Sequence, residues 1–140
     1  NHHSIFYKII KQKKNNPKVK NLYIKNFSLF KNLFNNWNLD VKKINIKIKK
    51  HHNKKIFIFG AHIFSQNLIK NGLNLDHIFG ILDNDKDKQN EYLYGTKLKV
   101  FSPYILKKFL DPVVILRAGE YNTEIKKQIT KKINLNTIFI

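Results

Sequence analysis

The clearest pattern in the first half of the chain is an apolar stripe with helical spacing. Apolar side chains recur at alternating intervals of three and four residues, with lysine and asparagine between them: Phe27, Phe30, Phe34, Trp37, Val41, Ile44 and Ile48. This spacing places all seven on one face of an α-helix. We therefore predict a long amphipathic helix over residues 27–50, about 33 Å long from 27 to 48. Its apolar face needs a partner, either a neighbouring domain or a second helix in a short coiled coil.

From residue 54 onward, short continuous apolar runs alternate with segments of helical spacing. Such runs are typical of strands covered on both faces. The predicted strands are residues 55–59, 77–82, 97–100, 112–116 and 137–140, and the predicted helices are residues 62–70, 102–109 and 121–132. The order is typical of a parallel sheet flanked by helices. We predict an α/β fold, a small Rossmann-like domain over residues 54–140.

We expect the segment before the long helix to belong to a different domain. Residues 4–10 are apolar and β-branched, so they predict a stray strand that needs a sheet to join. The chain opens with Asn1 and has no methionine. We expect a C-terminal piece of a longer protein, in which residues 1–53 are the end of an upstream domain plus a linker helix.

Charge is concentrated at the start of the chain. The net charge is +18, and residues 1–55 hold 15 lysines against one acid, Asp40. Such an arm could contact nucleic acid or an anionic membrane. Arg117 is the only arginine, however, and asparagine occurs 19 times. This pattern favours a composition bias over nucleic-acid recognition, which uses arginine for bidentate base contacts.

Composition excludes several classes of protein. The absence of cysteine excludes disulfides, thiolate metal sites and a cysteine nucleophile. No apolar run approaches the roughly 20 residues of a membrane span. Paired histidines at 2–3 and 51–52 lack the spacing of metal ligands. We expect a cytoplasmic protein with no metal and no membrane partner.

Candidate chemistry lies where the predicted strands end, since ligands bind there in parallel sheets. Gly60, Ala61, His62 and Ser65 form a turn before a helix, which suits an anion or serves only packing. The dinucleotide pattern requires glycine where His62 and Ser65 stand. A side chain at 62 should hinder a pyrophosphate.

Acidic residues follow the second predicted strand. Asp83 lies 23 residues after Gly60, the place of a ribose-binding acid. It could instead cap the Asp-Asn-Asp turn. Calcium binding by Asp83, Asp85 and Asp87 is a further alternative, although the glycine and final glutamate of an EF-hand loop are missing.

The remaining candidates come from a strand end and a polar loop. Arg117 suits a phosphate or carboxylate, or it forms an internal ion pair. Four side chains of the loop could face the same cleft: Lys88, Gln89, Tyr92 and Tyr94. No complete catalytic motif is present.

These segments carry a family likeness. The residues concerned are 56–66 (IFIFGAHIFSQ), 80–85 (GILDND), 88–89 (KQ), 93–96 (LYGT), 102–103 (SP) and 115–122 (ILRAGEYN). They resemble the C-terminal domain of sugar C-methyltransferases and related S-adenosylmethionine-dependent methyltransferases. The resemblance implies a parent enzyme that methylates a carbon of a nucleotide-linked keto sugar.

The resemblance also implies a division of labour. An upstream domain binds S-adenosylmethionine and holds the catalytic groups, whereas this chain completes the substrate cleft, has no cofactor and is inactive alone. No catalytic role is transferred to a residue here. The implied cleft residues are Gly60, Ala61, His62, Ser65, Asp83, Tyr94, Arg117, Glu120 and Tyr121. Two alternatives remain: a stand-alone nucleotide or nucleotide-sugar binding module, and a basic nucleic-acid binding protein.

Overall fold

A five-stranded sheet forms the centre of the molecule. The computed structural model describes residues 21–140, so the predicted strand at residues 4–10 lies outside the described part. The strands are β1 (Ile56–Phe59), β2 (Ile78–Leu82), β3 (Val100–Phe101), β4 (Val113–Leu116) and β5 (Ile138–Phe139). Their order is β3-β2-β1-β4-β5, and every neighbouring pair is parallel. The predicted α/β fold is confirmed.

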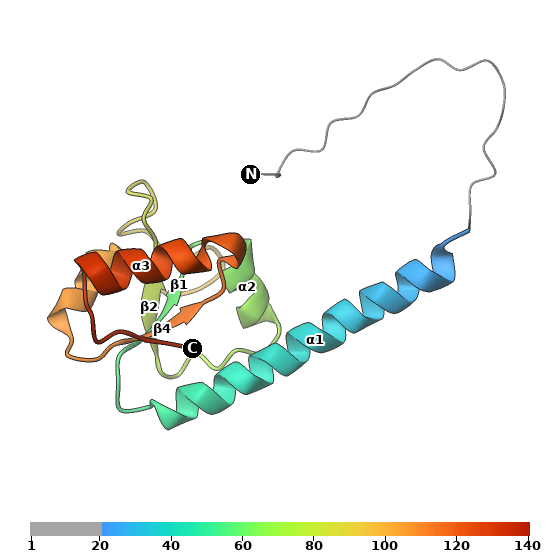
Figure 1. Cartoon of the computed structure of the whole chain (residues 1–140), viewed down its shortest axis with the longest axis horizontal. Helices are drawn as coiled ribbons and strands as arrows, with labels where there is room; N and C mark the ends of the chain where they lie inside the picture. The colour runs from blue at the N-terminus through green and yellow to red at the C-terminus, as the bar shows by residue number, and fades with distance from the viewer. Residues whose placement is uncertain (1–20) are drawn as a thin grey trace, which may run out of the picture.

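Helices cover both faces of this sheet (Figure 1). All four side chains of β1 are buried, and they alternate between two hydrophobic clusters because successive side chains of a strand point to opposite faces. Ile56 and Ile58 pack with α1 (Tyr23–Lys50) and α2 (Ile63–Lys70). Phe57 and Phe59 pack with the 3₁₀ helix η1 (Pro103–Lys108) and with α3 (Asn122–Lys132), which follows the short 3₁₀ turn η2 (Gly119–Tyr121).

Helix α1 is docked over only part of its length. Val41, Ile44 and Ile48 belong to the core, and Figure 1 shows the N-terminal half of the helix projecting beyond the sheet and its covering helices. Phe27, Phe30, Phe34 and two leucines of this half, Leu29 and Leu33, remain exposed. The predicted helix is therefore confirmed, but the structure provides a partner for the second half of its stripe alone.

Two predicted elements differ in extent or type. Residues 97–100 were expected to form a strand, but the strand begins only at Val100. Leu98 bonds back to the preceding loop, where its carbonyl accepts from the Leu93 N–H. Lys99 contacts both sides: it bridges Tyr92 in antiparallel fashion, and its carbonyl accepts from the Ile81 N–H of β2 at 2.9 Å. Residues 103–108 form a 3₁₀ helix capped by the Ser102 hydroxyl, as the Ser-Pro start indicates, but they do not continue as an α-helix.

The helices in the described part of the chain, residues 21–140, are all too short or too polar to cross a lipid bilayer.

Candidate functional site

The candidate site lies where the strand order reverses. From β1, the chain continues to β2 on one side of it, and it later returns to β4 on the other side. In open parallel sheets, ligands bind at the carboxyl ends of such strands. A cleft of about 560 Å³ lies there. Five of the nine predicted residues line it: Gly60, His62, Asp83, Glu120 and Tyr121.

The turn after β1 is closed by a histidine. Gly60 has φ +103°, and a Cβ at this position would lie 2.1 Å from His62 Nε2. The imidazole is held there because its Nδ1 accepts a hydrogen bond from the Phe64 N–H at 3.2 Å, which caps α2. The ring therefore covers the glycine that a pyrophosphate would approach, as the sequence led us to expect.

Burial also favours the neutral form of this imidazole. Desolvation lowers the pKa of His62 below its ordinary value of 6.5. The Asp83 carboxylate acts in the opposite direction, and the Lys88 ammonium lowers the pKa further. A neutral ring agrees with the capping role, since Nδ1 must keep its lone pair to accept the Phe64 N–H.

Asp83 ties the two strand ends together. Its carboxylate is largely buried, with Oδ2 accepting from the Ala61 N–H at 2.7 Å and Oδ1 from the Asp85 N–H at 2.9 Å. Of the two roles considered, turn capping is the one that the geometry shows. No group of three histidine or acidic side chains within residues 21–140 is placed to hold a metal ion, which leaves the calcium alternative without support.

Lys88 brings a positive charge to the cleft. Its Nζ lies 3.8 Å from Asp83 Oδ2 and 3.5 Å from Asp85 Oδ2. The lysine side chain is 44% exposed, so its ammonium can turn toward a ligand. The sequence placed Lys88 in a loop that could face the cleft but did not include it among the nine candidates. The signal was present, since it lies six residues beyond a strand end.

Ser65 supports the turn from inside. It is 1% exposed, and its Oγ donates to the Gly60 carbonyl at 2.5 Å. This serine lines none of the cavities described here. Its place favours a structural role, in holding Gly60 in the conformation that the turn requires.

Two smaller cavities flank the cleft. A cavity of about 280 Å³ is lined by Ala61 and Tyr94 and shares His62 and Lys88 with the cleft. A second, of about 230 Å³, is lined by Arg117 and shares Phe64 and Gly119 with the cleft. The structure therefore distributes eight of the predicted residues over three adjoining hollows rather than one.

Arg117 joins β4 to the end of the chain. Its Nη1 donates to the carbonyl oxygens of Leu116 at 2.9 Å and Ile140 at 3.2 Å. Within residues 21–140 it forms no ion pair with an acid, so the internal ion pair considered from the sequence is not observed. These contacts fix one edge of the guanidinium, and Arg117 also lines the smaller cavity.

Three aromatic residues that line the site were not predicted, the first of them Phe59, which lines the cleft. Phe64 lines both the cleft and the smaller cavity, and Trp37 lines the latter. Trp37 belongs to the stripe of α1, so the sequence indicated packing rather than a site. For Phe64 a signal existed, because an apolar residue in the first turn of a helix at a strand's carboxyl end faces the ligand-binding edge.

Comparison with known families agrees with this architecture. The family model described as the C-methyltransferase C-terminal domain matches residues 8–140, which is nearly the whole chain. No curated protein and no solved structure gave a match. The chain belongs to the C-methyltransferase C-terminal domain family.

Proposed function

We propose that this chain is the accessory domain of an S-adenosylmethionine-dependent methyltransferase and that its cleft receives a nucleotide-linked keto sugar. In this proposal an upstream domain of the same polypeptide binds the cofactor and supplies the catalytic groups. The observation that carries the proposal is the cleft of about 560 Å³ at the carboxyl ends of β1 and β2 and beside the loop after β4. Its volume lies within the usual range for small-molecule sites.

The lining of the cleft suits such a substrate. Lys88 supplies a cation for a diphosphate, and Glu120 and Tyr121 offer polar atoms for sugar hydroxyls. Phe59, Phe64 and Ile125 add an apolar wall, which is typical of small-molecule sites. The other acid of the cleft, Asp83, is engaged by two backbone N–H groups and stabilises its shape.

The residues present do not fit S-adenosylmethionine. An adenosine cofactor in a Rossmann-like fold uses an open glycine turn after the first strand and an acid free to bind the ribose. Here the His62 ring lies over Gly60, and both Asp83 oxygens accept backbone hydrogen bonds. We therefore assign no step of methyl transfer to this chain. Its contribution is to bind and orient the acceptor.

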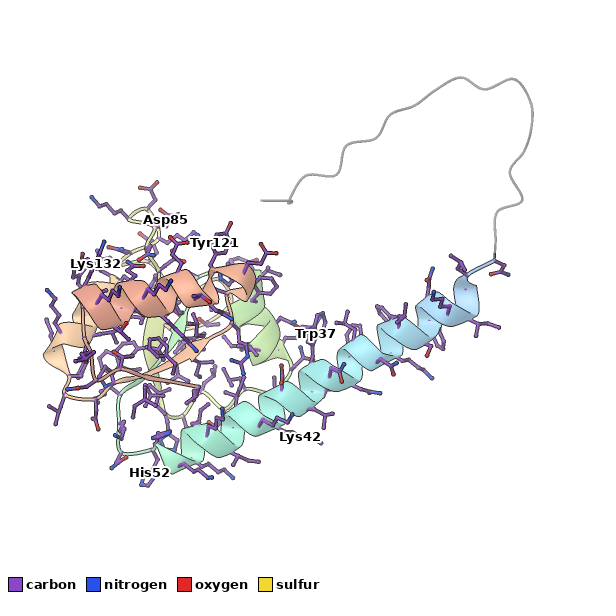
Figure 2. All side chains as sticks on the ribbon, viewed as in Figure 1. Trp37, Lys42, His52, Asp85, Tyr121 and Lys132 are labelled. Carbon is purple, nitrogen blue, oxygen red and sulfur yellow. The ribbon has the colours of Figure 1, made fainter. Side chains whose placement is uncertain are left out.

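Calorimetric titration with UDP-glucose and dTDP-glucose tests the substrate class. We expect saturable binding by the 140-residue chain, and Lys88→Gln should weaken it about tenfold through loss of one charge-assisted contact. The matched control is Lys132→Gln, since Lys132 and the cleft residue Tyr121 lie at opposite ends of α3 (Figure 2). Absence of binding, or an equal loss in both variants, would contradict the proposal.

We further propose that the upstream domain packs on the projecting half of α1. The exposed apolar side chains of this half lie together on one helix, and such a patch typically marks an interaction site. The family of this chain is described as a C-terminal domain. The aromatic rings of the patch are already ordered against one another: Tyr23 stacks on Phe27 at 5.9 Å, and Phe30 packs on Phe34 at 4.6 Å. Such preordering reduces the entropy lost on docking.

Hydrogen exchange on a longer polypeptide, extended through the coding sequence before Asn1, tests this partner. We expect the amides of residues 23–37 to be better protected in the extended protein than in the 140-residue chain. Phe30→Asp should remove that gain, whereas Asn32→Asp adds the same charge on the polar face and should not. Equal protection in the extended and short proteins would contradict the docking.

A further inference from the structure

The smaller cavity beside Arg117 has the character of a separate subsite. It measures about 230 Å³, below the usual range for a whole drug-sized ligand, and it opens along the main cleft through the shared residues Phe64 and Gly119. We propose that it holds the nucleobase of the nucleotide-linked sugar, while the sugar lies in the main cleft. This inference rests on the proposed function and adds the orientation of the ligand and a binding role for α1.

The walls of the cavity suit a flat ring. Trp37 of α1 and Phe64 of α2 line it together with the aliphatic side chains of Val41 and Leu68. Figure 2 shows Trp37 on α1 beside α2, where the helix leaves the rest of the molecule. Its indole is held edge-on by Phe34 at 5.2 Å between ring centroids. Aromatic side chains such as Trp37 and Phe64 can stack on the face of any nucleobase.

The polar groups of the cavity suit the edge of a base. Arg117 Nη1 donates to the backbone oxygens of Leu116 and Ile140, which orients the guanidinium. Its other nitrogens keep further N–H donors. Asn122 Oδ1 accepts a hydrogen bond from the Ala118 N–H at 2.8 Å, and the side chain also carries an amide N–H₂ donor. The Asp40 carboxylate also lines the cavity. These donors and this carboxylate, beside the Asn67 and Asn71 side chains that also line the cavity, match the carbonyls and ring N–H of a nucleobase.

The position of Lys88 indicates the direction of the ligand. Lys88 lines the main cleft and the cavity of about 280 Å³, but not the cavity of Trp37 and Arg117. A diphosphate near Lys88 therefore lies in the main cleft, and the base extends toward α1. The docked half of α1 would then act as a wall of the substrate site as well as a support for the sheet.

Trp37 is the only tryptophan of the chain, so its fluorescence reports on this cavity. The probes are UDP-glucose, UMP, AMP and ribose 5-phosphate, with N-acetyltryptophanamide correcting for light absorbed by the bases. We expect UDP-glucose and at least one mononucleotide to change the Trp37 emission, with a UDP-glucose midpoint equal to the calorimetric one. Ribose 5-phosphate, which has no base, should leave the emission unchanged.

Phe64→Ala provides the second arm. Phe64 is exposed, so its removal should leave the fold intact, and loss of stacking should weaken UDP-glucose binding about tenfold. The control is Tyr104→Ala, an exposed aromatic residue that lines neither cavity. If UDP-glucose binds while the Trp37 emission is unchanged, or if Phe64→Ala has no effect, the base subsite is wrong and the proposed function stands. If UDP-glucose does not bind, both fail.

Discussion

The two halves of α1 carry one apolar stripe and have opposite surroundings. Ile44 and Ile48 in the second half are 0% exposed, whereas Phe27, Phe30 and Phe34 in the first half keep between 40% and 57% of their surface. The spacing of apolar residues is the same in both. The difference therefore comes from the tertiary partner, since the sheet and α2 extend only as far as the second half.

The spacing of apolar residues along α1 indicates only part of its packing. Periodicity identifies a helix face that has to be covered, because exposed apolar surface is unfavourable in water. It does not indicate which body covers it. In this chain the Rossmann-like domain covers the docked half, and we assign the projecting half to the upstream domain. The following experiments test whether the two halves differ in energy as they do in burial.

Truncation of one residue of the apolar stripe in each half should give the largest contrast in stability. Ile44→Ala should lower the free energy of unfolding by about 2–5 kcal/mol, because it opens a cavity in the cluster shared with β1. Phe30→Ala should change it by less than about 0.5 kcal/mol, as for an exposed position. Urea denaturation of both variants measures the difference. Equal costs would mean that the projecting half is packed in solution.

Hydrogen exchange of the wild-type chain should show the same boundary without mutation. Amides of residues 41–50 should be protected nearly as well as those of β1, because their opening exposes the core. Amides of residues 23–36 should exchange faster by about tenfold or more, since fraying from the free end exposes little buried surface. Uniform protection along α1 would mean that the two halves are equally stable, contrary to this prediction.

The docked half is also fixed by one polar clamp. Asn45 Nδ2 donates to the Gly72 carbonyl at 2.9 Å, and its Oδ1 accepts from the Asn74 N–H at 2.8 Å. Asn45→Ala should cost about 1–2 kcal/mol in thermal or urea unfolding. Asn38→Ala, an exposed asparagine of the same helix, is the matched control and should be close to neutral. A neutral Asn45→Ala would show that apolar contacts alone dock the helix.

Acid should have the smallest effect on stability. It acts through His62, which caps α2, a helix that packs with the docked half of α1. The pKa of His62 is lowered below 6.5 in the folded chain, so the unfolded chain binds a proton more readily. The stabilisation is present above pH 6.5 and is lost as the pH falls through the lowered pKa. His62→Asn keeps a capping acceptor and removes the titration. The variant should therefore lose less stability than wild type between pH 7.5 and 5.5, and an equal loss would contradict this origin.

Most of the fold was predictable because its signals are local. The continuous apolar runs at 55–59 and 112–116 gave the central strands β1 and β4, and the stripe gave α1. The start of the third strand was not predicted correctly because the Leu98 carbonyl bonds to the Leu93 N–H of the preceding loop, and only the Lys99 carbonyl reaches β2, through the Ile81 N–H. Short polar segments do not reveal such contacts in the sequence.

The candidate cleft lies at the strand ends that the sequence indicated, and five of the nine predicted residues line it. The contacts of the individual residues were less predictable. Asp83 and Arg117 were ambiguous because their roles depend on partners far along the chain, Ala61 for the first and Ile140 for the second. Trp37 was not predicted, since its place in the site depends on where the domain ends along α1.

The most direct test of the account measures the binding of S-adenosylmethionine and of UDP-glucose or dTDP-glucose to the same 140-residue sample by equilibrium dialysis. We predict saturable binding of a nucleotide sugar and no binding of the cofactor. Stoichiometric binding of S-adenosylmethionine, or methyl transfer by this chain alone, would contradict the central claim that the domain binds the acceptor and leaves the chemistry to its partner.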